Sequence, residues 1–180
     1  MANLPTPREA LELLARAGCT PPVIEHCKVV SQLAVEFAKR AKVSGMNVDI
    51  DLIRVGGLLH DIGRSKTHSV EHGFKGAEIA SSLGLPEPLT RIIERHVGSG
   101  IPAEEAVKLG LPKRDFIPET LEEKIVSYAD KLIEGKRRKS FDVTLDRFAK
   151  ELGSTHPAPR SASESAPDER SDQSDDCRSA

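Results

Sequence analysis

The sequence has few aromatic residues, 3% of 180 residues with no Trp, and no strand-like alternation of apolar and polar positions. Its core must therefore be built from Leu, Ile, Val and Ala, which suits closely packed helices better than a β-domain. No segment approaches the roughly 20 apolar residues of a membrane-spanning helix. The N-terminus also lacks a basic run followed by an apolar stretch. We therefore expect an all-α, soluble, cytoplasmic protein without a membrane partner.

The cysteines and the net charge exclude further classes. Cys19, Cys27 and Cys177 are an odd set without the Cys-x-x-Cys spacing of a disulfide framework or a structural zinc site. A formal net charge of -2 gives no reason to expect a nucleic-acid partner. The oligomeric state stays open, with a homodimer as one alternative.

The composition predicts one domain over residues 1–152 and a disordered, acidic, Ser/Pro-rich tail over residues 153–180. The tail contains no Leu, Ile, Val or Phe, and its three arginines are opposed by six acidic residues. Such a segment cannot bury enough apolar surface to offset the entropy of ordering. The preceding residues have room for a single aliphatic core.

Apolar periodicity and capping residues predict a bundle of six to eight helices. The first three are expected at 7–17, from 22 to about 41, and from about 49 to 63. A fourth carries His72, Gly76, Ile79 and Leu83 on one face, and a fifth carries Leu89, Ile92 and His96. The last two begin at 118 and at 140, the latter ending near 152. Between them, residues 98–117 are irregular around a short helix near 103–109, and this segment could form a lid.

Glycines in and after the third predicted helix give two further expectations. Gly63 is expected to end the helix in a left-handed conformation. Gly56 and Gly57 each cost about 1 kcal/mol relative to Ala inside a helix. We therefore expect another helix to approach closely at this pair.

Imidazole and carboxylate side chains recur on the inward sides of five predicted helices. They are His26, His60, Asp61, His72, His96 and Asp130. Burying so many polar groups is costly unless they are paired, and a divalent metal ion would pair them. Imidazole nitrogens and carboxylate oxygens without thiolates suit Mn²⁺, Fe²⁺, Co²⁺, Ni²⁺ or Zn²⁺ better than an iron-sulfur cluster or an all-oxygen Ca²⁺ cage.

The segment Leu58 to Gly63, with the letters LLHDIG, resembles the His-Asp signature of the HD phosphohydrolases in its HDIG variant. His26 upstream resembles the first metal ligand of that family. Asp130, in a Tyr-Ala-Asp-Lys-Leu segment, resembles the last ligand. The resemblance covers roughly residues 22–148 and implies a helical HD domain whose first metal ion is held by His26, His60, Asp61 and Asp130.

A subset of HD proteins carries two extra histidines between the His-Asp pair and the final Asp, and His72 and His96 resemble these two. The resemblance then implies a second ion held by His72 and His96, with Asp61 as the bridge. HD enzymes that cleave diadenosine tetraphosphate symmetrically share this layout. The chain departs from HD cyclic-dinucleotide phosphodiesterases, because Arg64 stands where they usually have Lys and their Gly-Tyr-Pro segment is missing.

The implied activity is hydrolysis of a phosphoester or phosphoanhydride in a nucleotide-like substrate by metal-activated water, without a protein nucleophile. His60 and Asp61 would be catalytic as well as ligands. Arg64, Lys66 and Lys131 lie within a few residues of the ligands and are candidates to bind substrate phosphate. His68 could protonate a leaving group.

Two other functions stay open at this point. Some HD proteins with the same six ligands are di-iron oxygenases acting on small phosphonates or polyols. A catalytically silent nucleotide-binding module is the third alternative. The basic run at residues 136–139 could attract polyphosphate or RNA, but an exposed turn is the favoured interpretation.

Overall fold

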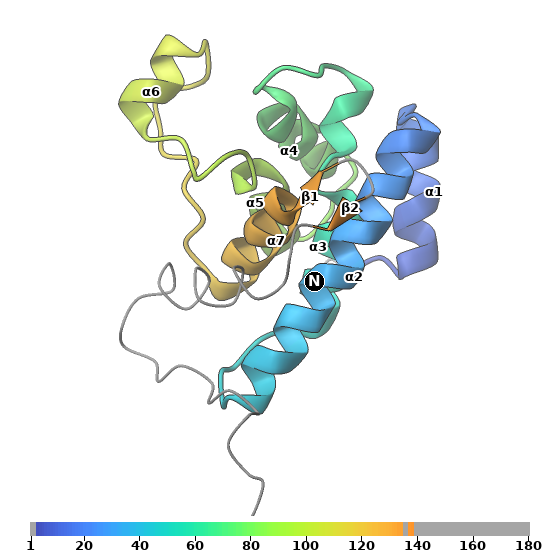
Figure 1. Ribbon diagram of the computed structural model, residues 1–180. Coiled ribbons are helices and arrows are strands. Elements are labelled where there is room, and N and C mark those ends of the chain that lie inside the picture. Colours follow the sequence, from blue (N-terminus) through green and yellow to red (C-terminus); the bar gives the residue numbers. More distant parts are fainter. Residues whose placement is uncertain (1–2, 135–136, 139–180) are drawn as a thin grey trace, which may run out of the picture.

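The computed structural model describes residues 3–134 and 137–138 of the chain (Figure 1). The α-helices are α1 (Pro7–Ala17), α2 (Pro21–Val43), α3 (Ile50–Leu59), α4 (His72–Ser82), α5 (Glu87–Arg95), α6 (Ala103–Lys108) and α7 (Leu121–Leu132). A 3-10 turn, η1 (Ile62–Ser65), follows α3. Strands β1 (Ile133–Glu134) and β2 (Arg137–Arg138) pair antiparallel. They are too short to show period-2 alternation. The predicted all-α fold is confirmed, while the expected helix from residue 140 and the tail lie outside the described residues.

The helix starts that the sequence predicts best depend on side chains that cap the backbone. Thr6 and Glu9 form a reciprocal capping box at α1, and Gly18, with a φ of 94°, ends this helix. Asp49 accepts the N–H groups of Asp51 and Leu52 at the start of α3. Local chemistry therefore determines these boundaries.

The predicted end of the third helix was wrong. Helix α3 ends at Leu59, and Gly63 does not have a positive φ. A Cβ at Gly63 would lie 1.9 Å from the carbonyl oxygen of His72 and 2.6 Å from the backbone nitrogen of Gly76. Glycine is therefore required here because η1 packs directly against the backbone of α4.

Two other boundaries differ from expectation. The helix predicted from Pro118 begins at Leu121, because the Thr120 hydroxyl accepts the N–H of Glu123 and caps the helix there. Leu83, expected on the inward face of the fourth helix, is 45% exposed just after α4. The buried residues of α4 are instead His72 and the small residues Gly73, Gly76, Ala77 and Ala80. Close packing against α5 selects this narrower face.

Long helix α2 packs along α3 and α7, and α5 lies between these helices and α4 (Figure 1). One apolar cluster, with Phe37, Ile53 and Ile125, joins α2, α3, α5 and α7. A second cluster joins α1, the start of α2, α3, η1, α4 and α5. The expected close approach at the paired glycines is confirmed, since a Cβ at Gly57 would lie 2.7 Å from the Cα of Ser31.

Residues 98–117 form an arm with its own small apolar cluster. Ile101, Leu111 and Phe116 are buried there against Phe74 at the start of α4. An isolated bridge pairs Ile101 with Phe116, and α6 projects from the rest of the bundle (Figure 1). The short helix expected near 103–109 is confirmed as α6. A lid function for the arm stays a prediction.

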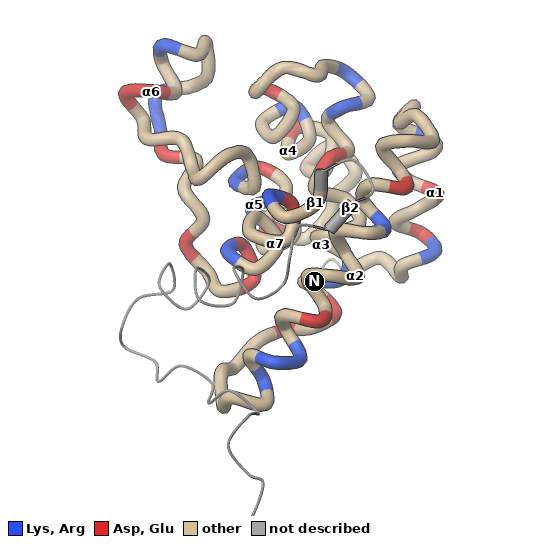
Figure 2. The backbone as a smooth tube through the Cα atoms, viewed as in Figure 1, with Lys and Arg blue, Asp and Glu red and all other residues tan. Residues whose placement is uncertain are grey.

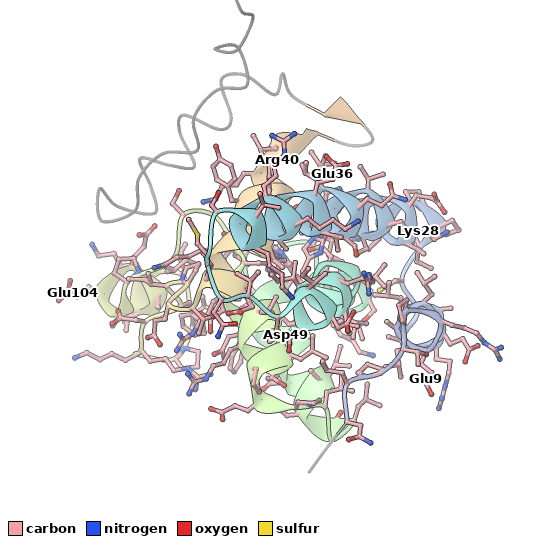
Figure 3. All side chains as sticks on the ribbon, turned by 90° about the horizontal axis from the view of Figure 1, so that it is seen from below. Glu9, Lys28, Glu36, Arg40, Asp49 and Glu104 are labelled. Carbon is pink, nitrogen blue, oxygen red and sulfur yellow. The ribbon has the colours of Figure 1, made fainter. Side chains whose placement is uncertain are left out.

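Charged residues of both signs are interspersed along the helices (Figure 2). Lys28, Glu36 and Arg40 lie along the outer side of α2, and Glu104 lies on the projecting α6 (Figure 3). Within residues 3–134, no helix combines the length and the apolar character needed to cross a bilayer.

Candidate metal centre

The structure brings the six predicted ligand residues together from five parts of the chain. They are His26 on α2, His60 and Asp61 directly after α3, His72 at the start of α4, His96 directly after α5 and Asp130 in the last turn of α7. His60, Asp61, His72 and His96 are buried, whereas His26 and Asp130 reach the surface. The polar cluster thus lies between the helices and opens to solvent on one side.

The outer group consists of His26, His60, Asp130 and the Oδ2 atom of Asp61. Asp130 Oδ1 lies 2.9 Å from His26 Nε2 and 3.4 Å from His60 Nε2. Asp61 Oδ2 lies 3.8 Å from His26 Nε2 and 3.7 Å from His60 Nε2. Two imidazole nitrogens and two carboxylate oxygens therefore face one small space.

The inner group consists of His72, His96 and the Oδ1 atom of Asp61. Asp61 Oδ1 lies 3.3 Å from His72 Nε2 and 3.5 Å from His96 Nε2. The two imidazole nitrogens are 3.0 Å apart. Since Asp61 presents one oxygen to each group, its carboxylate is the link between them. His60 stands beside both, because its ligand atom also lies within 4.8 Å of those of Asp61 and His96.

Backbone carbonyls fix the orientation of three of the imidazoles. The Nδ1 atoms of His60, His72 and His96 each donate to the carbonyl three residues earlier, at 2.8 Å, 2.7 Å and 2.8 Å. A carbonyl oxygen only accepts, so Nδ1 carries the proton and Nε2 presents its lone pair to the cluster. The negative C-terminal ends of α3 and α5, which precede His60 and His96, also favour a cation here.

Electrostatics keep the carboxylates ionised. Burial tends to raise the pKa of Asp61, but the neighbouring His60, His96 and Arg64 outweigh it and hold the pKa well below its usual range. The pKa of Asp130 is likewise lowered despite its burial, by the hydrogen bond to His26 and by the neighbouring His60.

The pKa values of two imidazoles, those of His72 and His60, are shifted in opposite directions. Burial lowers the pKa of His72 to about 4, and the nearby His96 adds to this effect, so this ring is neutral at pH 7 as a metal ligand must be. Burial also tends to lower the pKa of His60, but the charge of Asp61 reverses the direction and raises it. The space beside His60 therefore favours a positive charge.

The residues fit one or more divalent cations. Three buried side-chain atoms among the described residues have no hydrogen-bond partner: Arg95 Nε, outside the cluster, and His60 Nε2 and Asp61 Oδ1 within it. The two atoms in the cluster are costly to bury unless a cation is bound. With His72 and His96 both protonated at Nδ1, their Nε2 lone pairs would face each other at 3.0 Å. Ligand atoms about 2.1 Å from one ion lie about 3.0 to 3.4 Å apart in octahedral or tetrahedral geometry, which matches the shorter separations here.

The residues predicted to bind phosphate or to donate a proton differ in how closely they approach this centre. Arg64 is partly exposed, and its Nε donates to Asp61 Oδ2 at 2.6 Å. Lys66 and His68 are exposed on the turn after η1, and Lys131 lies beside Asp130 on α7. The side chains of these last three make no hydrogen bond or ion pair within the described residues. Only Arg64 is thus in direct contact with the cluster.

Sequence reasoning missed three residues next to the centre, which are Arg95, Glu123 and Ser127. Arg95, directly before His96, forms ion pairs with Glu119 and Glu123. Ser127 donates a hydrogen bond to the carbonyl of His96. The only sequence signal was their position, because Glu123 and Ser127 precede Asp130 by two turns and one turn on the same helix.

Comparisons with known proteins agree with the fold and the motif. The model of the HD domain family matches residues 23–134. An uncharacterized protein of Methanocaldococcus jannaschii is 52% identical over 150 residues, which are 83% of this chain and 88% of that protein.

Two kinds of larger enzymes also contain a related region. A tRNA (cytidine(56)-2'-O)-methyltransferase of Thermoplasma volcanium is 41% identical over 147 residues, 82% of this chain and 42% of the enzyme. A ribonuclease Y of Pseudothermotoga lettingae is 33% identical over 133 residues, 71% of this chain and 22% of the enzyme. The chain therefore spans less than half the length of either enzyme.

Among solved structures, the HD domain of the L. monocytogenes phosphodiesterase PgpH in complex with cyclic-di-AMP is similar, with a TM-score of 0.58 at 17% identity. The similarity covers 80% of this chain and 81% of that one, and at this identity it bears on the fold alone. The HD family match extends over more than half of the chain and includes all six clustered residues. This protein therefore belongs to the HD domain family.

Proposed function

We propose that this protein is a metal-dependent phosphohydrolase that uses two divalent transition-metal ions to cleave a phosphoester or phosphoanhydride bond in a nucleotide-like substrate. The observation that carries the proposal is the placement of Asp61, whose two carboxylate oxygens face two separate groups of imidazoles. A single ion would need only one of these groups. A carboxylate that bridges two ions would use both oxygens of Asp61 and both groups of imidazoles.

The proposed ligands follow from these groups. The outer ion would be held by His26, His60, Asp61 and Asp130, and the inner ion by Asp61, His72 and His96. Bound ions would supply a water molecule with a lowered pKa and neutralise charge on the phosphoryl oxygens. None of the six proposed ligands is a serine or a cysteine, and the Cys27 thiol beside His60 is buried, so hydrolysis would use water directly.

The chain's own residues would bind and orient the substrate. Arg64 is the strongest candidate, because its guanidinium already lies at the outer group and can bind a phosphate through two parallel hydrogen bonds. Lys66 and Lys131 would add positive charge at the rim. His68, exposed on the same turn as Lys66, would protonate the leaving group, since imidazole is the side chain that most often transfers protons in enzymes.

The names of the relatives extend the set of substrates worth testing. The methyltransferase and the ribonuclease act, by name, on RNA, and the PgpH domain was solved with a cyclic dinucleotide. All three kinds of ligand contain nucleotides. A test should therefore include mononucleotides, dinucleoside polyphosphates, cyclic dinucleotides and short oligoribonucleotides.

The first experiment is elemental analysis of the purified full-length protein by mass spectrometry, paired with an anaerobic assay of the same sample against these substrates. We expect two transition-metal equivalents and metal-dependent release of phosphate or nucleotide. Product formation that requires both iron and oxygen would identify an oxygenase instead. A fully loaded protein that binds nucleotides without turnover would identify a binding module.

A further inference from the structure

The inward face of α7 carries three polar residues at helical spacing. Glu123, Ser127 and Asp130 follow one another at intervals of four and three residues and therefore share one side of the helix. Asp130 reaches the outer group, whereas Glu123 and Ser127, each 2% exposed, do not belong to either group. Buried polar side chains are costly unless they have partners, and their partners are at the end of α5.

Ser127 holds the carbonyl that belongs to an inner-group ligand. Its hydroxyl donates to His96 O at 3.0 Å and lies 3.5 Å from Gly98 O. The hydroxyl has one proton, so the shorter bond to His96 takes it. The His96 carbonyl is among the last of α5 and has no partner within its own helix. Ser127 thus ties the backbone of this ligand to α7.

A buried ion pair fixes the preceding residue in the same way. Arg95 Nη1 lies 3.3 Å from Glu123 Oε2, and Glu123 is almost fully buried. Glu123 Oε2 also accepts the backbone N–H of Glu119 at 2.7 Å. Arg95 and Glu119 form a second, more exposed ion pair at 2.8 Å. Arg95, the last residue of α5, and His96, directly after it, are therefore both held by α7, at points one helical turn apart.

Helix α4 holds the same end of α5 from the other side. A Cβ at Gly73 would lie 2.7 Å from Val97 Cγ2 and 2.9 Å from Glu94 O, so the two backbones are in close contact. His72, the other inner-group imidazole, is the neighbour of this glycine. The position of His96 relative to His72 is therefore set by α4, and its position relative to Asp130 is set by α7.

We infer that Glu123 and Ser127 are positioning residues that set the affinity of the inner ion without touching it. The inference rests on the proposed binding of two ions. Partners that orient metal ligands typically contribute about 10- to 100-fold to metal affinity. Since the hydrogen bond of Ser127 and the ion pair of Glu123 both act on the end of α5, which carries His96, the outer ion should bind with unchanged affinity when these side chains are altered.

The test is titration of the metal-free, full-length protein with Mn²⁺ and with Co²⁺. Calorimetry measures the binding of each ion, and the visible absorption of Co²⁺ reports its coordination. In the Ser127→Ala variant we expect the affinity for one ion to fall about 10-fold or more, with the other unchanged. Glu123→Gln, which keeps the shape and removes the charge, should weaken the same ion. It provides a second route if one variant folds poorly.

Thr120→Ala is the matched control, because the Thr120 hydroxyl caps the start of α7 by accepting the backbone N–H of Glu123 and, within the described residues, forms no hydrogen bond with α5. This variant should lower the melting temperature and leave both ion affinities unchanged. Equal weakening of both ions by Ser127→Ala, no weakening of either, or the same pattern in Thr120→Ala would overturn the inference. A wild-type protein that binds fewer than two ions would overturn the proposed binuclear centre and the inference with it.

Discussion

The outer and inner groups of the centre use the same chemistry in different surroundings. The side chains of His26 and Asp130 in the outer group are 18% and 25% exposed. Those of His72 and His96 in the inner group are 7% and 1% exposed. Arg64, the one cation in contact with the cluster among the described residues, approaches from the outer side, through Asp61 Oδ2. If the proposed function is correct, substrate would therefore meet the outer group, whereas the inner group depends on the packing of the bundle.

The largest effect should come from the residue that the two groups share. Asp61→Ala removes one oxygen from each group, so we expect loss of both ions and of hydrolysis. Elemental analysis and the phosphate-release assay check this. Asp130→Ala is the comparison, because it removes an oxygen from the outer group alone and should leave one ion bound. Retention of two ions by Asp61→Ala would contradict the proposed bridging role of Asp61.

The two ions should also leave at different rates. A chelator should remove the outer ion first, because two of its proposed ligands reach solvent, and the inner ion in a slower second phase. Release is followed by the absorbance of a metal-indicator dye. In His26→Ala we expect only the slow phase with about half of the metal. Release of both ions in a single phase from the wild-type protein would contradict the distinction.

Gly63→Ala should damage the inner group selectively. The added methyl group would collide with the backbone of α4 at His72 and Gly76, and such overpacking typically costs about 1 to 3 kcal/mol of stability. His72 should then move away from Asp61, so the inner ion should be weakened in titrations while the outer ion is kept.

Gly84→Ala is the matched control for this change. Gly84 has a φ of 68°, and no atom lies within 4 Å of the place that an added methyl group would take, so Ala there should cost about 1 to 2 kcal/mol through backbone strain alone. Both ions should stay bound with unchanged affinity. If Gly84→Ala weakened the inner ion as much as Gly63→Ala, general instability would be the cause.

The smallest of these effects should be confined to substrate binding. Arg64→Ala should raise KM for an anionic substrate about 10-fold, the loss of about 1.4 kcal/mol expected for one charged hydrogen-bonded contact, and leave both ions in place. Lys66→Ala, which removes an exposed charge two residues later, should change KM less. Steady-state kinetics at fixed metal concentration measure both. Loss of an ion in Arg64→Ala would indicate that Arg64 orients Asp61 for metal binding and does not serve mainly to bind substrate.

The sequence predicts those features that depend on local chemistry. The capping box at Thr6 and Glu9 identifies the start of α1, and the Leu58 to Gly63 motif with its partner residues identifies the six members of the cluster. Contacts between distant backbones are not encoded in this way. The end of α3 and the requirement for Gly63 depend on α4, and the role of Ser127 depends on where the His96 carbonyl lies. The division of Asp61 between two groups likewise needed the structure.

The hydrogen bonds from Nδ1 to the carbonyl three residues earlier recur at His60, His72 and His96. Each bond closes within a single turn of backbone, so each ring is aimed by its own segment. Assembly of the bundle then has to bring three pre-oriented rings to the right places, and little side-chain rotational entropy remains to be lost when an ion binds. The centre is in this sense preorganised, and tertiary packing governs chiefly the spacing of its ligands.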